Sequence, residues 1–466
     1  MNVPSQLNRS FDLLVIGSGA AGGGAAEVAH AAGRSVAIIE KDKVGGDCPN
    51  YACVPTKALL RSAKVYALLK RAGEFGLRAR AVGFEWAKVL ARKEWIVRHT
   101  GAATAEQQYQ QEGIALFKGA AAFEDEHHVR VDGQVVRGDK IMIATGSKPA
   151  MPRIPGIEAA KPITSVEAVS LRRLPASLII IGGGPVGCEF AQLFSTFGVQ
   201  VIMLEMANTI LPHEEPELSQ IIHQTLELNG ANIVTAIKVM QLTQDGRRKM
   251  VQTRVKGEIR EFEAEEILMA AGREPQTAEL RLDAIGVGID GGGRVKIDEY
   301  LQTTQPHIYA GGDVSGPLLF THVAHYQGAL AGMNMWSGTP RRADYRVVPR
   351  VTFTEPEIAS VGLTEEQARQ QGCKVGIGTY DIGYLGKALV ESEDIGLIKL
   401  IADVRSGAIL GGDIVAPAVG EMIQQIVAAM TARERYATLR MPFIRFPHSR
   451  RVMSTTVRSV SCRRKS

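Results

Sequence analysis

The chain carries one pattern of apolar and glycine positions twice. The first copy, residues 11–40, passes from the apolar run Leu13–Ile16 through a glycine-rich turn into a segment of small residues and ends in a second apolar run. The second copy, residues 176–205, keeps the same order. Short apolar runs separated by a glycine turn and about a dozen further residues predict strand, turn, helix and strand. We therefore predict two units of the same kind, each built around a parallel sheet.

Both turns space their glycines as G-x-G-x-x-G: Gly17, Gly19 and Gly22, then Gly182, Gly184 and Gly187. In such turns the first glycine permits the tight bend, the second lets the backbone approach a pyrophosphate, and the third lets helix and strand pack closely. An acid ends each second strand at the same distance from the first glycine, Glu40 (40 − 17 = 23) and Glu205 (205 − 182 = 23). The shared spacing predicts two dinucleotide sites.

Glu205 bears on which nucleotide the second site takes. A carboxylate at this position accepts a hydrogen bond from a free ribose 2′-hydroxyl and repels a 2′-phosphate. The sequence therefore favours NAD(H) over NADP(H) at the second site.

Composition changes this interpretation little. A length of 466 residues with 45% hydrophobic and 22% charged residues is ordinary for a globular protein of several domains. The net charge of +5 belongs to the end of the chain, because nine Lys and Arg follow Glu434 and the remainder carries 5 − 9 = −4. We predict neither a nucleic-acid partner nor a membrane span. The N-terminus lacks an apolar signal core, which predicts a cytoplasmic protein.

The stretch "VGGDCPNYACVPTKALL" places Cys48 and Cys53 in a C-x4-C arrangement. The pair is open to three interpretations: a structural disulfide, half of a metal site, or a redox couple. A zinc site needs two more ligands at comparable spacing, and none is evident. A structural disulfide is disfavoured in a reducing cytoplasm.

The chain resembles the FAD-dependent pyridine nucleotide-disulfide oxidoreductases over about residues 11–435. Besides the two glycine turns and the cysteine stretch, the resemblance rests on "IMIATGSKP" (141–149), "MAAGREPQT" (269–277) and "IYAGGDVSG" (308–316). It implies an α/β fold with two Rossmann-like domains, for FAD and NAD, and a C-terminal α+β dimerisation domain. The implied divisions are FAD-binding (1–150), NAD(P)-binding (151–272), a return to the FAD domain (273–345) and the interface domain of a homodimer (346–466).

The resemblance also assigns roles to single residues. It makes Cys53 the flavin-facing sulfur and Cys48 the outer sulfur that attacks the substrate, so that the redox interpretation fits best. Lys57 would stand near the flavin edge, paired with Glu189. Asp47 departs from the family, since it stands where relatives often carry Thr. The remaining residues assigned to cofactor binding are Ala121, Thr145, Gly146, Gly272, Asp313 and His322.

The end of the chain departs from the family pattern. Most members that act on thiols end in His-Pro-Thr-x-x-Glu, whose His serves as acid-base for the substrate thiol. Here the chain ends "MPFIRFPHSRRVMSTTVRSVSCRRKS", with His448 after Pro447 and no acid following. Read from one nucleotide earlier, synonymous codons for "MPFIRFPHSRRV" can spell "HAFHPLPTLAES". We therefore hypothesise a frameshift near residue 440.

Together these features predict a flavoenzyme most like dihydrolipoamide dehydrogenase, acting on a small disulfide or dithiol. A mercuric-reductase-like enzyme that reduces a soft metal ion is the alternative, weakened because Cys462 stands alone near the C-terminus. A flavin redox sensor of low turnover is a third interpretation, and the missing His-Glu segment favours it. An NADH oxidase is disfavoured because that activity usually needs one redox cysteine.

Overall fold

Strand β1 (Arg9–Ile16) lies near the centre of the first sheet in this computed structural model, which describes residues 9–437. It runs parallel to β2 (Val36–Glu40) on one side and to β6 (Gln134–Ile143) on the other. Residues 13–16 are at most 2% exposed. A parallel strand covered on both faces is apolar without alternation. The sheet is completed by β3 (Ala115–Lys118), β4 (Ala121–Phe123), β5 (His128–Val131) and β16 (Ile308–Ala310).

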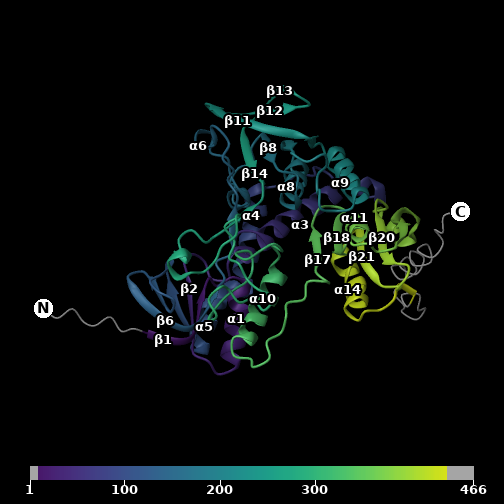
Figure 1. The fold of residues 1–466 in the computed structure, drawn as a ribbon. Helices are drawn as coiled ribbons and strands as arrows, with labels where there is room; N and C mark the ends of the chain where they lie inside the picture. Colours follow the sequence, from purple (N-terminus) through teal and green to yellow (C-terminus); the bar gives the residue numbers. More distant parts are fainter. Residues whose placement is uncertain (1–8, 438–466) are drawn as a thin grey trace.

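Two helices from distant parts of the chain pack together on this sheet. Helix α1 (Ala20–Ala31) follows the first glycine turn, and α10 (Thr321–Asn334) lies beside it (Figure 1). A Cβ added to Gly328 would stand 1.9 Å from the carbonyl oxygen of Ala21. The two backbones can therefore approach closely only because the contact is made by very small residues.

A second unit, formed by residues 150–272, is inserted in the chain before the last strand of the first sheet, and we call it the inserted unit. It repeats the order of strand, turn and helix around the second glycine turn. Strands β8 (Ser177–Ile181) and β9 (Gln200–Leu204) are parallel and are joined by α8 (Pro185–Thr196). A three-stranded antiparallel sheet lies at the outer edge, at the top of Figure 1. The other helices and strands of the unit are α6 (Ile157–Ala160), α7 (Ser165–Ala168), α9 (Pro216–Leu228), β10 (Asn232–Val234), β11 (Ile237–Asp245), β12 (Arg248–Val255), β13 (Glu258–Ala264) and β14 (Glu266–Met269).

The chain enters and leaves the inserted unit through a two-stranded ribbon. Strand β7 (Ser147–Pro149) pairs antiparallel with β15 (Arg273–Pro275). The ribbon brings Arg273 within hydrogen-bonding distance of Asp47, which lies 226 positions earlier in the chain and directly precedes Cys48.

Four α-helices follow one another in the chain between β2 and β3 of the first sheet. Helix α3 (Cys53–Lys70) carries Cys53 and Lys57 and packs against α4 (Trp86–Arg98). Its far end touches the inserted unit, where the ring of Tyr66 stacks on that of Phe197 at 5.6 Å. The remaining two are α2 (Asp47–Asn50), which carries Cys48, and α5 (Gly101–Glu112).

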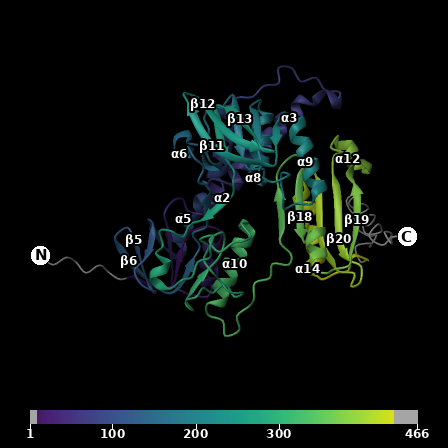
Figure 2. The same ribbon diagram turned by 45° about the horizontal axis from the view of Figure 1, so that its top comes forward.

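The C-terminal unit is a five-stranded antiparallel sheet beside the inserted unit (Figure 2). Buried charges join the two: Arg350 pairs with Glu214 at 2.8 Å, and Lys399 pairs with Glu215 at 2.6 Å. The elements of the unit are β17 (Pro349–Thr352), β18 (Glu357–Gly362), β19 (Val375–Asp381), β20 (Leu397–Asp403), β21 (Ile409–Ala416), α11 (Glu365–Gln370), α12 (Gly386–Glu391), α13 (Val419–Met422) and α14 (Gln424–Thr431).

The predicted fold class, two Rossmann-like units with a C-terminal α+β unit, is confirmed. The domain limits at 150, 272 and 345 stay predictions. Between residues 9 and 437 we find no helix long and apolar enough to span a membrane.

Candidate active site

The first glycine turn is shaped for a ligand that approaches the backbone. Gly17 has φ +100°, and a Cβ there would lie 2.4 Å from the carbonyl oxygen of Ala144. A Cβ at Gly22 would lie 1.9 Å from the Gly17 carbonyl oxygen, so this glycine serves helix packing. A Cβ at Gly19, at the start of α1, would meet only the Cα of Gly46, at 3.9 Å. The free N–H groups of the helix therefore face a space that suits a pyrophosphate.

Glu40 closes this turn from the end of β2. Its Oε2 accepts hydrogen bonds from the backbone N–H of Ser18 at 2.9 Å and from the Ser18 hydroxyl at 2.7 Å. Its Oε1 accepts one from the N–H of Asp42 at 2.8 Å. These bonds hold the buried carboxylate at the rim of the turn, where a ribose hydroxyl can reach it.

The second turn repeats this arrangement. Gly182 has φ +115°, and its Cβ would lie 2.3 Å from the carbonyl oxygen of Ala270. A Cβ at Gly187 would lie 2.0 Å from the Gly182 carbonyl oxygen, whereas Gly184 is open. Glu205 accepts hydrogen bonds from the N–H groups of Gly183 and Ala207. The two turns, whose glycines and acids are equally spaced in sequence, thus share the same close backbone approaches and the same hydrogen bond from the turn to the acid.

A cavity of about 990 Å³ opens at the first turn and extends to the cysteines. This volume lies at the upper end of the range of cofactor clefts. Its lining includes the glycine turn with Glu40 and also the two cysteines, which suits an extended dinucleotide. The predicted site residues that line it are Gly17, Gly19, Glu40, Cys48, Cys53, Lys57, Ala121, Thr145, Gly146, Glu189 and Asp313. Those that do not are Gly22, Gly182, Gly184, Gly187, Glu205, Gly272 and His322.

Cys53 is the first residue of α3, with its sulfur 3.6 Å from the hydroxyl oxygen of Thr321. The hydrogen bond from the Cys48 thiol lowers the pKa of Cys53 to about 6. Thr321 and the charge of Lys57 act in the same direction, against burial. A helix N-terminus also stabilises a thiolate. Cys53 is therefore the group that carries negative charge near neutral pH.

Cys48 carries the proton of the pair. Its hydrogen bond to Cys53, together with burial and the charge of Cys53, raises the pKa of Cys48 above that of a free thiol. Both cysteines are half-buried thiols. The two sulfurs are thus within hydrogen-bonding distance, and the proton between them stays on Cys48.

Lys57 and Glu189 form an ion pair that lines the same cavity as the cysteines. The ammonium nitrogen of Lys57 lies 3.0 Å and 2.7 Å from the two carboxylate oxygens of Glu189. The lysine side chain is 34% exposed and the glutamate 5%. Glu189 also accepts a hydrogen bond from the N–H of Phe353 at 3.0 Å, and the Phe353 ring lies 4.7 Å from the Lys57 nitrogen. The pair therefore joins the redox helix, the second glycine turn and the C-terminal unit.

Four residues near the cysteines were missed by the sequence reasoning. Arg273 donates hydrogen bonds to the carboxylate of Asp47 at 2.6 Å and to the hydroxyl of Ser147 at 2.7 Å. The Ser147 hydroxyl in turn donates to Asp313 at 2.5 Å. Arg273 and Ser147 lie inside two recognised family motifs, but the motifs do not reveal that their side chains contact each other and Asp47. Thr321 and Phe353 carry no sequence signal beyond their neighbours.

His322 does not line the cavity, whereas its neighbour Thr321 does. The imidazole of His322 stacks on Phe320 at 5.5 Å, and burial lowers its pKa against the hydrogen bond to the carbonyl of Pro349. A role of His322 beside the flavin stays a prediction. His448, Cys462 and the proposed frameshift lie outside the described residues.

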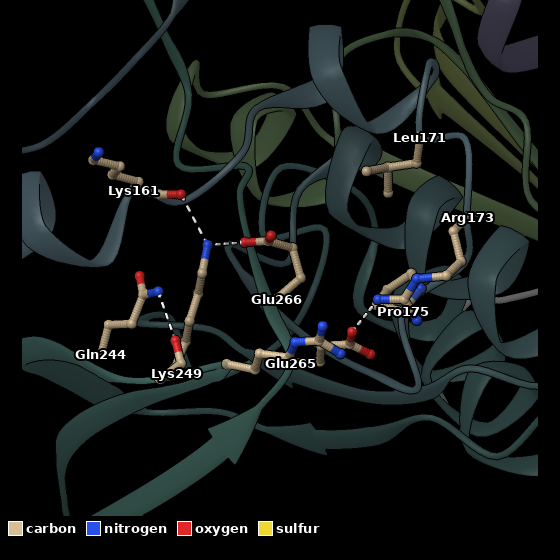
Figure 3. A pocket seen from close by; sticks show the side chains of 10 residues that line it. Lys161, Leu171, Arg173, Pro175, Gln244, Lys249, Glu265 and Glu266 are labelled. Carbon is tan, nitrogen blue, oxygen red and sulfur yellow. Dashed lines mark hydrogen bonds and ion pairs between the residues drawn. The ribbon is translucent and has the colours of Figure 1, made fainter.

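A second cavity, of about 520 Å³, lies between the ends of the inserted unit's strands (Figure 3). Its charges are largely satisfied by one another: Lys249 contacts Glu266 and the carbonyl of Lys161, and Arg173 contacts Glu265. The first cavity, which holds the thiols, is therefore the candidate active site.

Comparisons with known proteins identify the family of the chain. The family model for pyridine nucleotide-disulphide oxidoreductases matches residues 11–328, and the dimerisation domain of the same family matches residues 348–457. The chain therefore belongs to this family of oxidoreductases, whose members contain FAD and take electrons from NAD(P)H.

Particular relatives differ in their substrates. A mercuric reductase of Bacillus cereus is 36% identical over 91% of this chain and 67% of its own length. A dihydrolipoyl dehydrogenase of Bacillus subtilis (strain 168) is 34% identical over 90% of this chain and 92% of its own length. Among solved structures, the HOCl-induced flavoprotein disulfide reductase RclA from Escherichia coli superposes with a TM-score of 0.85 at 29% identity, covering 97% of this chain and 99% of that one.

Proposed function

We propose that the protein reduces a small disulfide of the lipoamide class with electrons from NADH, with Cys48 as the attacking sulfur and Cys53 as the thiolate beside the flavin. The observation that carries this proposal is the placement of two free thiols, Cys48 and Cys53, in the cavity that opens at the first glycine turn. Cys53 begins α3, and the hydrogen bond from Cys48 lowers its pKa to about 6. Lys57 and Glu189 adjoin this pair at the side of the second nucleotide turn.

Bound FAD would accept a hydride equivalent from the nicotinamide and pass the electron pair to the Cys48–Cys53 disulfide. Gly17, Gly19 and Glu40 would hold its adenosine and pyrophosphate end, and Asp313 its ribityl chain. Lys57 would stand at the reactive edge, and the 5% exposed carboxylate of Glu189 orients its ammonium group.

The reduced cysteine pair then completes the reaction by thiol–disulfide exchange. Cys48, once deprotonated, attacks one sulfur of the acceptor, whose sulfur–sulfur bond breaks and whose first thiolate leaves with a proton. Cys53 attacks the Cys48 sulfur of the mixed disulfide and releases the second thiolate, which takes another proton. The acceptor gains two electrons and two protons. The cysteines lose two electrons and the one proton held on Cys48, and the second proton comes from solvent. Run in reverse, these steps oxidise dihydrolipoamide.

Deprotonation of Cys48 needs a base. Among residues 9–437 no histidine lines the cavity. We propose that the enzyme is a homodimer, as the match to the dimerisation domain supports, and that the partner subunit completes the acceptor side.

Glu205 supports NADH as the donor. Its carboxylate is fixed by two backbone N–H groups at the rim of the second turn, where a 2′-phosphate would meet a negative charge.

A second candidate acceptor is a soft metal ion, with both cysteine sulfurs as its ligands. Three mercuric reductases at 34–36% identity and the structure of a Cu(II) complex of RclA, with a TM-score of 0.86, favour it.

Anaerobic turnover of the FAD-loaded protein with NADH separates these acceptors, with lipoamide and mercuric ion compared and Cys48→Ser as the control. Lipoamide turnover that is lost in the variant supports the first proposal. Mercuric turnover with inert lipoamide supports the second. Flavin reduction by NADH with neither acceptor active would contradict both.

A further inference from the structure

Asp47 places a carboxylate beside the two redox cysteines. It precedes Cys48 directly and begins the short helix α2. Its negative charge raises the pKa of both Cys48 and Cys53. Taken alone, this charge opposes the thiolate that the exchange chemistry requires.

Arg273 meets this carboxylate from the ribbon that leads back from the inserted unit. Its terminal nitrogen lies 2.6 Å from Oδ2 of Asp47 and 2.9 Å from the carbonyl oxygen of Ser147. Its Nε donates to the Ser147 hydroxyl at 2.7 Å and lies 3.6 Å from Oδ2 of Asp313. The planar guanidinium can satisfy these partners together, which a lysine cannot.

The guanidinium of Arg273 and its carboxylate partners are partly buried, which strengthens the ion pairs between them. Arg273 is 21% exposed, and its two carboxylate partners Asp47 and Asp313 are 35% and 21% exposed. All three line the cavity that suits the dinucleotide. Without the guanidinium, two carboxylates would face a ligand that carries a pyrophosphate, and one of them would also face the thiolate.

We propose that Asp47 and Arg273 form a charge-balanced clamp that fixes the redox-cysteine loop to the ribbon β7–β15 and to Asp313 on the flavin side of the cavity. Both are positioning residues, since they act through the cysteines and the cofactor site. The clamp rests on the proposed redox role of Cys48 and Cys53.

The clamp predicts shifts of opposite sign in the dithiol–disulfide equilibrium. Asp47→Asn removes a negative charge near the thiolate and favours the reduced pair. Arg273→Gln leaves the Asp47 charge uncompensated and favours the disulfide. We expect each variant to change the equilibrium constant against glutathione by about threefold, in opposite directions. A contact that merely holds the loop in shape predicts shifts of the same sign.

The experiment equilibrates full-length protein, with and without FAD, in glutathione redox buffers and counts free Cys48 and Cys53 thiols by mass spectrometry. The double variant D47N/R273Q should return toward the wild-type equilibrium, and Arg273→Lys should stay closer to it than Arg273→Gln. FAD retention should fall roughly tenfold in Arg273→Gln and remain in Asp47→Asn. Arg342→Gln, which removes an exposed ion pair with Glu299, is the matched control.

Equal shifts in both single variants, or none, would overturn the clamp. Because these equilibria need no NADH and no acceptor, that failure is distinct from failure of the proposed function. A wild-type protein whose cysteines form no disulfide would overturn the redox assignment itself, and the clamp with it.

Discussion

The carboxylate of Glu189 lies 2.7 Å from the ammonium nitrogen of Lys57, across 132 positions of sequence. The contact joins α8, which begins at the second nucleotide turn, to α3, which begins at Cys53. Because Glu189 is 5% exposed and its other bond is to the backbone of Phe353, its orientation is fixed. The position of Lys57 is therefore set by the inserted unit as much as by its own helix.

Lys57→Ala should slow flavin reduction by NADH at least roughly tenfold, because it removes the positive charge that we propose for the reactive edge and leaves Glu189 buried without its partner. Anaerobic stopped-flow reduction of the FAD-loaded protein measures this. Lys88→Ala, at an exposed ion pair with Glu85, is the control and should reduce at the wild-type rate. Unchanged kinetics in Lys57→Ala would count against the role.

The Cys53 thiolate should be present above about pH 6 and be lost as the pH falls through that value, because its pKa is lowered to about 6. Cys48→Ala removes the hydrogen bond that contributes most to this lowering, so the midpoint should move to higher pH. The ultraviolet absorbance of the thiolate, followed against pH in the reduced protein, measures the midpoint. A midpoint that does not move would show that Cys48 does not hold the shared proton.

Glu205→Gln should raise the ratio of kcat/KM for NADPH to that for NADH by roughly tenfold, since it removes the charge that repels a 2′-phosphate. The backbone bonds to Gly183 and Ala207 can be kept in part by the amide oxygen. Initial rates with each nucleotide give the ratio. Glu227→Gln, at an exposed position of α9, serves as the control, and an unaltered ratio in E205Q would locate the specificity elsewhere.

Asp413 should make the protein less stable as the pH rises. This carboxyl is 2% exposed, and its Oδ2 has no hydrogen-bond partner. Burial raises its pKa to about 7, and the nearby charges of Glu215 and Glu214 add to the rise, against Ser360 and Arg350. A carboxyl whose pKa is raised by folding stabilises the fold below its unfolded pKa, and this contribution is lost as pH rises through the folded value.

Asp413→Asn should therefore increase the free energy of unfolding at pH 8 by up to about 4 kcal/mol and change it little near pH 4. Urea unfolding at both pH values measures the difference. Asp139→Asn, at an exposed ion pair, should show no such dependence on pH. Equal effects of Asp413→Asn at both pH values would mean that the carboxyl is not neutral in the folded protein.

The parts of the fold that the sequence could predict are those with local signals. The apolar runs and glycine spacings mark β1, α1, β2 and their counterparts β8, α8, β9, because strand burial and the turn each leave a short-range pattern. The proximity of Lys57 to Glu189 came from the family resemblance, since nothing periodic links positions so far apart.

The contacts of Arg273 could not be predicted in this way. They depend on how β15 pairs with β7 and on where that ribbon meets α2, which is a matter of packing between units. Likewise Thr321, one residue before the predicted His322, is the first residue of α10, and its hydroxyl oxygen lies 3.6 Å from the sulfur of Cys53. A sequence motif does not show which of two neighbouring residues points into the cavity, and here it is Thr321 and not His322 that lines it.

Helix α8 has a consequence for how the enzyme can be altered. Gly184 at its start and Glu189 are five positions apart, about 7.5 Å along a helix axis. No loop lies between the turn that is shaped for the nucleotide and the carboxylate that holds Lys57, so nothing can absorb a displacement of one before it reaches the other. A displacement of the second glycine turn is thus passed through α8 and Glu189 to Lys57 on α3. Substitutions at the second turn that change donor specificity are therefore expected to disturb the position of Lys57 as well.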